Sequence, residues 1–127
     1  MTEVDVVEIQ VPADVVYVST LRLTAASLAA RCDLTIDEIE DLRLAVDEAC
    51  SLLLPHARTG SALQARFEVS PGRLAVQTSV HTDTAAEPDR TGFAWTVLGA
   101  LASSVDVRQE ADRLVIVVTK TRAAAAT

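Results

Sequence analysis

Residues 35–57 show the strongest pattern of hydrophobic and polar positions in the chain. Apolar side chains recur there at spacings of three and four, the period of one buried face of an α-helix. Thr35 and Glu38 form a capping box at the start, and Leu54-Pro55 ends the pattern because a residue before proline disfavours the helical conformation. The apolar positions of this predicted helix are Ile36, Ile39, Leu42, Val46, Ala49 and Leu53.

The rest of the chain divides into shorter segments with their own patterns. Alternation of apolar and polar residues predicts five strands, and the Pro71-Gly72 and Ala111-Asp112 turns join four of them into two hairpins. Helical spacing predicts a helix from an Asp14 cap to about Ala30. The predicted strands are 4–11, 62–69, 73–80, 105–110 and 113–121, with a buried helix over 92–103, a polar loop over 81–91 and a frayed tail over 122–127.

This order of elements predicts an α+β fold. Its simplest packing is a two-layer sandwich, with the helices over one face of a mixed, mostly antiparallel sheet. A chain of 127 residues is large enough to bury a core without disulfides or metals. We therefore expect a single domain that spans residues 1–127.

Composition and charge narrow the classes of function. No stretch approaches the ~20 consecutive apolar residues of a membrane span, and the acidic N-terminus lacks the features of a secretion signal. A cytoplasmic protein that does not bind a membrane is the expectation. The net charge of −7 and the lack of a basic cluster argue against direct nucleic-acid binding, because phosphate neutralisation supplies most of that affinity. The same charge suits a basic protein partner.

The two cysteines, Cys32 and Cys50, do not have the spacing of a metal site. We expect both to be small buried hydrophobic residues with free thiols, and we expect no bound metal. A role in sensing oxidation stays open, since it requires an exposed thiol with a lowered pKa.

Glu48 fits neither the core nor the surface of the predicted central helix. It lies on the flank of the apolar stripe, where its carboxylate should be partly buried, and it forms a row with Leu52 and His56, one residue per turn. Such a glutamate serves either as a general base or metal ligand, or as a structural residue that pairs with an arginine.

Residues 11–57 resemble the first half of the bacterial anti-sigma factor/serine-protein kinase family. The similarity runs without a gap through VPA at 11–13, RLT at 22–24, DEIEDLRLAVDEAC at 37–50 and His56-Ala57. The second half is less similar. These proteins share the Bergerat fold with the histidine-kinase-type ATPases. The resemblance therefore implies a nucleotide between the helix layer and the loop that precedes the third helix.

The resemblance assigns a general base to Glu48, but the family's magnesium-binding asparagine falls on Leu52. Leucine has no oxygen for a cation that requires oxygen ligands. The aspartate that reads adenine falls on Val80 and its companion glycine on Thr82. Asp83 replaces that aspartate only if the strand register shifts, which would turn its side chain to the other face of the sheet.

The family's Gly-x-Gly segment beside the phosphates falls on Gly92-Phe93-Ala94, so one glycine is kept and Ala94 replaces the other. Glu48, Leu52, Val80, Thr82, Gly92 and Ala94 then outline a remnant pocket in which Glu48 is vestigial. We expect no cofactor, with weak binding of Mg-ATP as the alternative. Phosphoryl transfer depends on metal-assisted positioning, so an active kinase is not the first expectation.

The partner surface implied by the resemblance lies on the first helix. The arginine that contacts the family's partners is Arg22, and an acidic contact one turn earlier falls on Val18. An anti-sigma factor that sequesters an alternative sigma factor, and is released by an anti-anti-sigma (STAS-type) antagonist, is the leading hypothesis. A homodimer is expected with it. The alternatives are an active serine-protein kinase that phosphorylates the antagonist, and an adaptor that binds no sigma factor.

Overall fold

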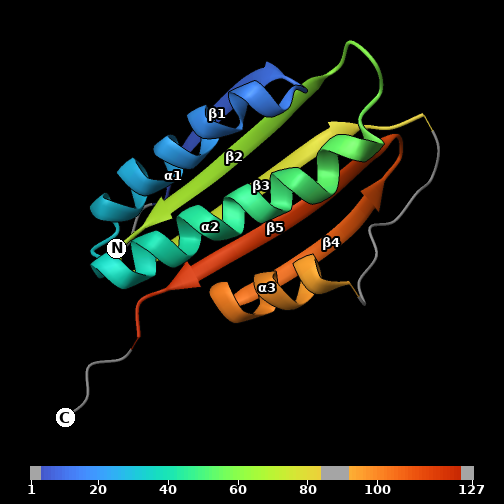
Figure 1. Ribbon diagram of the computed structural model, residues 1–127. Coiled ribbons are helices and arrows are strands. Elements are labelled where there is room, and N and C mark those ends of the chain that lie inside the picture. Colours follow the sequence, from blue (N-terminus) through green and yellow to red (C-terminus); the bar gives the residue numbers. More distant parts are fainter. Residues whose placement is uncertain (1–3, 84–91, 124–127) are drawn as a thin grey trace.

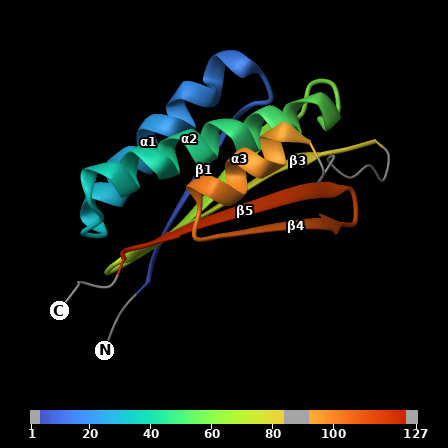
Figure 2. The same ribbon diagram turned by 60° about the horizontal axis from the view of Figure 1, so that its bottom comes forward.

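A five-stranded sheet carries three α-helices on one face in the computed structural model, which describes residues 4–83 and 92–123 (Figures 1 and 2). The strand order is β1-β2-β3-β5-β4. The two-layer α+β prediction is confirmed, but all four pairings of described strands are antiparallel, so the sheet is not mixed. The elements are β1 Asp5–Pro12, η1 Val15–Tyr17, α1 Val18–Arg31, α2 Ile36–Leu53, η2 Leu54–His56, β2 Ala62–Ser70, β3 Arg73–His81, α3 Phe93–Leu101, β4 Ser104–Glu110 and β5 Arg113–Thr121.

Helix α2 lies in the middle of the helix layer, over β3 and β5 (Figure 1). Its capping box is present, since the Thr35 amide donates to Glu38 Oε1 at 2.8 Å and the Glu38 amide donates to Thr35 Oγ1 at 3.2 Å. The predicted stripe is confirmed at four fully buried positions: Leu42, Val46, Ala49 and Leu53.

The prediction was wrong for Ile36, which is 85% exposed. Two successive steps of three residues, from 42 to 39 and from 39 to 36, each fall short of a full turn. They turn Ile36 about 120° away from the centre of the buried stripe. The regular spacing therefore placed Ile36 in the buried stripe, although its side chain lies at the surface.

The sheet packs one face against the helices and leaves the other open (Figure 2). Successive side chains point to opposite faces, so alternate residues of each strand enter the core. The largest fully buried side chains of the strands are Leu63, Phe67, Leu74, Val76, Val80, Leu114 and Ile116. Among the described residues, no helix is long and apolar enough to cross a membrane.

Helix α3 is shorter and more exposed than the predicted buried helix over 92–103. It spans Phe93–Leu101 and lies beside α2 at the β4 edge of the sheet (Figure 1). Leu98 is its one fully buried residue, whereas Phe93 is 84% exposed. An apolar sequence does not ensure burial, because a helix at the margin of a layer is covered on one side only.

The predicted fraying of the tail from residue 122 is also wrong at its start. The Arg122 amide donates to the carbonyl of Gly72 at 2.7 Å, and the Arg122 guanidinium pairs with Asp33. The Ala123 amide donates to Glu38 Oε2 at 2.8 Å. These contacts fix the chain after β5 to the start of the helix layer. Residues 124–127 and most of the predicted 81–91 loop lie outside the described residues.

Both cysteines are buried, as predicted. Cys32 and Cys50 have no exposed surface, and neither forms a disulfide. Burial raises the pKa of Cys50 to about 12, with a further contribution from the nearby negative charge of Asp47. Burial also raises the pKa of Cys32, partly offset by a backbone hydrogen bond at Ser70. Neither thiol has the exposed, low-pKa environment of a redox sensor.

We predict that neither thiol reacts with a thiol-specific reagent in the native protein at neutral pH, and that both react after unfolding in urea. The raised pKa also predicts a loss of stability in alkali. Because the folded state favours the neutral thiol, this contribution to the free energy of unfolding is complete below the unfolded pKa of about 9 and is lost as the pH rises toward about 12. Rapid stoichiometric labelling of the folded chain would contradict the predicted burial.

Candidate functional site

Two sides of helix α2 carry the candidate residues. On the side toward α1, Arg22 Nη1 donates to Asp47 Oδ1 at 3.1 Å. On the side toward α3, Asp41 pairs with Lys120 of β5 at 3.2 Å, and the Lys120 ammonium also donates to the carbonyl of Leu101 at 2.8 Å. Seven residues make two turns of a helix, so Glu48 lies on the same side as Asp41.

Arg22 is held in place rather than freely solvated. Its side chain is 32% exposed, and its partner Asp47 is 38% exposed. The Nε atom of Arg22 is buried without a hydrogen-bond acceptor among the described residues. The ion pair orients the guanidinium on the outer side of the α1–α2 pair and leaves it with unused donor capacity.

Val18 does not share that surface. It is 6% exposed and belongs to the hydrophobic core beneath α1. Its assignment to a partner surface is therefore corrected, because a side chain that faces the sheet offers almost no area to another protein. Arg22, four residues later, is rotated from the core direction toward α2.

Glu48 is half-buried, as predicted from its place on the flank of the stripe. The structure shows no hydrogen bond or ion pair of Glu48 within the described ranges, so the expected pairing with a neighbouring cation is absent there. Leu52, one turn later, is half-buried and packs against the core. The row predicted for these two residues is thus present, with a carboxylate followed by an apolar side chain.

The end of β3 contains the other positions of the remnant pocket. Val80 is 1% exposed and lies in the core. The amide of Thr82 donates to the carbonyl of Asp112 at 2.7 Å, and its hydroxyl donates to the same carbonyl at 3.3 Å. Neither side chain presents a free polar group, because one is apolar and the other is already used in packing β3 against the β4–β5 turn.

Asp83 is engaged by a cation that the sequence did not point to. Arg58 Nε donates to Asp83 Oδ1 at 2.8 Å, and Arg58 Nη2 approaches Asp112 Oδ2 at 3.3 Å. The hydrogen bond to Asp83, followed by that to Asp112, raises the pKa of Arg58 above its ordinary value. His81 Nδ1 lies 3.4 Å from the same Asp112 oxygen. Asp83 therefore belongs to an ion-pair cluster at the end of the sheet.

Gly92 and Ala94 lie at the start of α3. Gly92 is the N-cap residue, and its carbonyl accepts a hydrogen bond from the amide of Thr96 at 3.3 Å. Its φ of −74° is available to any residue, so this position does not require glycine for its conformation. Ala94 is half-buried within the first turn.

The residues at these positions do not fit a magnesium nucleotide well. Magnesium requires oxygen ligands, and Leu52 supplies none. Val80, which the resemblance places at the adenine-reading position, is packed in the core, and the polar groups of Thr82 and Asp83 have protein partners. Among the described residues no group of three metal-ligating side chains is present. Glu48 alone keeps the chemistry that the family resemblance assigns to it.

Three residues of this region were not singled out from the sequence: Asp47, Arg58 and Lys120. Asp47 and Arg22 are separated by 25 residues, and Arg58 and Asp112 by 54. Their contacts arise from the packing of distant elements. The one local signal in the sequence was the charged Lys120 at a position of β5 that faces the helices. Its side chain is 13% exposed, and a buried ammonium group requires hydrogen-bond acceptors, here Asp41 and the carbonyl of Leu101.

Comparison with known proteins finds relatives of similar sequence. The serine-protein kinase RsbW of Bacillus velezensis is 41% identical over 78 residues, which cover 59% of this chain and 49% of that protein. RsbW of Bacillus subtilis is 43% identical over 75 residues, which cover 57% of this chain and 47% of that protein. The chain thus spans about half the length of these relatives.

The fold is also found in a solved structure. The crystal structure of the RsbU and RsbW domains of Rv1364c from Mycobacterium tuberculosis matches 92% of this chain and 32% of that chain, with a TM-score of 0.71 and 14% sequence identity. The family described as "Histidine kinase-like ATPase domain" matches residues 11–120. Since that match covers most of the sequence, the chain belongs to the family of histidine kinase-like ATPase domains.

Proposed function

We propose that this protein is a cytoplasmic anti-sigma factor that sequesters an alternative RNA polymerase sigma factor and binds nucleotide weakly or not at all. A competing anti-anti-sigma antagonist of the STAS type releases the sigma factor. The observation that carries the proposal is the apolar packing of Leu52 and Val80 at two positions where the family resemblance places nucleotide ligands. The resemblance of residues 11–57 to the anti-sigma factor/serine-protein kinase family supplies the partner class, and the relatives named serine-protein kinase RsbW support that resemblance.

The loss of nucleotide binding follows from what these side chains contribute to the protein itself. Val80 is a core residue, and a carboxylate in its place would be buried without a partner unless a ligand supplied one. Leu52 adds apolar contact to the same core. Glu48 is then a remnant of the catalytic site, since one carboxylate does not position or neutralise phosphates.

The outer surface at the start of α1 supports a partner site around Arg22. Three consecutive apolar residues of η1 are exposed: Val15 by 75%, Val16 by 66% and Tyr17 by 42%. Leu23, next to Arg22, is 64% exposed. Protein interfaces concentrate their binding energy in aromatic and arginine side chains that are surrounded by apolar contacts. A half-buried arginine fixed by Asp47 is already ordered, which reduces the entropy that binding must remove.

The acidic character of the chain supports a protein partner of opposite charge. A net charge of −7 attracts a basic, DNA-binding protein and speeds its encounter, but it disfavours direct contact with nucleic acid or with an anionic membrane. We infer that the 127-residue chain acts as one domain in this complex.

We also propose a homodimer formed through the edges of the sheet. Among the described strands, β1 pairs with β2 on one side only, and its outer edge offers a row of backbone donors and acceptors. Light scattering at micromolar concentration is expected to give the mass of two chains. The mass of a single chain would contradict the dimer and leave the sigma-binding proposal intact.

The alternative function is an active kinase that phosphorylates the anti-anti-sigma antagonist. Glu48 makes no hydrogen bond or ion pair within residues 4–83 and 92–123, and this favours the kinase, since the carboxylate is available as a general base. Transfer of labelled phosphate from ATP to a serine of a co-purified antagonist, abolished by Glu48→Gln, would establish the kinase.

The first test of the leading proposal is a native pull-down with the tagged full chain, with and without Mg-ATP, followed by mass spectrometry. We expect a sigma factor at equal abundance in both conditions, because the nucleotide positions do not supply ligands. Recovery that rises with Mg-ATP would contradict the loss of nucleotide binding, and recovery of no sigma factor would contradict sequestration.

Arg22→Ala is predicted to weaken binding of the recovered sigma factor by roughly 1–2 kcal/mol, the usual cost of truncating an interface arginine. The matched control is Arg31→Ala, which removes the same charge from the exposed C-terminal end of the same helix. Calorimetry with the purified pair measures both. Equal affinities of the two variants would remove Arg22 from the partner site.

A further inference from the structure

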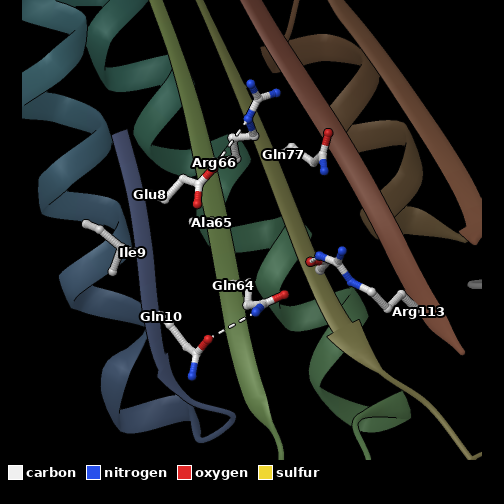
Figure 3. A pocket seen from close by; sticks show the side chains of 9 residues that line it. Glu8, Ile9, Gln10, Gln64, Ala65, Arg66, Gln77 and Arg113 are labelled. Atoms are coloured by element: carbon white, nitrogen blue, oxygen red, sulfur yellow. Dashed lines mark hydrogen bonds and ion pairs between the residues drawn. The ribbon is translucent and has the colours of Figure 1, made fainter. Parts of the chain in front are cut away.

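The open face of the sheet contains a groove that the proposed function does not use. It has a volume of about 320 Å³ and crosses β1, β2, β3 and β5 on the face opposite the helices (Figure 3). A second hollow of about 450 Å³ on the same face shares Arg66 and Gln77 with it. The polar side chains that line the groove are Glu8, Gln10, Gln64, Arg66, Gln77, Ser79 and Arg113.

The two arginines of the groove differ in their partners. Arg66 lies between two carboxylates, 3.7 Å from Glu8 and 3.6 Å from Glu68. Arg113 has no ion pair with any described residue. Its guanidinium instead donates from Nη2 to the hydroxyl of Ser79, across from β5 to β3. One full positive charge in the groove therefore faces a neutral acceptor.

The hydrogen bonds of Arg113 are also incomplete. Its Nε atom is buried and has no acceptor among the described residues. A buried donor on a charged group is costly to leave unsatisfied, so a change of rotamer toward an incoming acceptor is favourable. The nearby amide of Gln77 already accepts a hydrogen bond from Arg108 through its oxygen, which leaves its NH₂ group to donate.

The chemistry of this lining selects the ligand. Two guanidinium groups, a hydroxyl and three carboxamides present more donors than acceptors. The planar fork of arginine matches the oxygens of carboxylate and phosphate groups. Glu8 acts in the opposite direction, because its carboxylate competes for Arg66 and repels an anion.

We propose that this groove binds a small multivalent oxyanion, either a phosphate or a di- or tricarboxylate, at Arg113 beside Ser79. The site is independent of the proposed function, since it lies on the other face of the sheet from Glu48 and Leu52. Binding there requires no magnesium and reports nothing about kinase activity.

The test is a titration of the ¹⁵N-labelled full chain at constant ionic strength, with inorganic phosphate in one arm and citrate in the other, followed by amide chemical shifts. Saturable shifts confined to β1, β2, β3 and β5 are expected in at least one arm, and the arm that saturates identifies the chemical class. Arg113→Gln should weaken binding at least about tenfold, as expected for loss of a charge-assisted hydrogen bond.

Two further variants keep the test decisive. Glu8→Gln removes the competing carboxylate and should strengthen binding several-fold, and it remains informative if Arg113→Gln fails to fold. Arg43→Gln is the matched control, because it removes one arginine charge from the outer surface of α2, where Arg43 pairs with Glu40. No saturation at millimolar concentrations in either arm, or equal weakening by Arg43→Gln, would overturn the proposal.

Discussion

The packing of α2 against β3 and β5 is the interaction on which the rest of the structure depends. Its buried stripe of Leu42, Val46, Ala49 and Leu53 is fully removed from solvent, and each of the large side chains contributes about 1.5–3 kcal/mol on burial. This packing fixes the rotation of the helix. Asp47 then faces α1 and holds Arg22, while Asp41 and Glu48 face α3. Both candidate sites inherit their geometry from one hydrophobic contact.

The same contact supports the proposed loss of nucleotide binding, because the fold is packed there without a ligand. A polar side chain that serves a ligand gains its partners only when the ligand binds. Leu52 and Val80, which the resemblance places at ligand positions, make apolar contacts within the protein instead. Arg58 has a similar effect at the sheet end, where it supplies Asp83 and Asp112 with a permanent cation. The polar groups at this end of the sheet therefore have their partners within the chain.

The sequence predicted the features that local interactions determine. The Thr35 capping box, both hairpins and the burial of the cysteines depend on residues close in sequence or on strong hydrophobicity, and they are confirmed. The predicted burial of Ile36 and of helix α3 was wrong, because an apolar sequence does not reveal whether another element covers that side chain or helix. The pairing of Arg22 with Asp47 was not predictable, since it depends on how two helices meet. The burial of Val18 also depends on how α1 packs and was not predictable from the sequence.

The side chains of strand β3 show how the two faces of the sheet differ in chemistry. Val80 points into the core beneath the remnant pocket, and its neighbour Ser79 points into the arginine-lined groove. Coupling between the faces would require an element with two discrete arrangements. Strand β3 is hydrogen-bonded along its length to β2 on one side and to β5 on the other, and its core side chains are close-packed. A strand that is hydrogen-bonded on both edges has no alternative register that binding in the groove or binding at the helix layer could favour. Events in the groove and at the helix layer should therefore be independent.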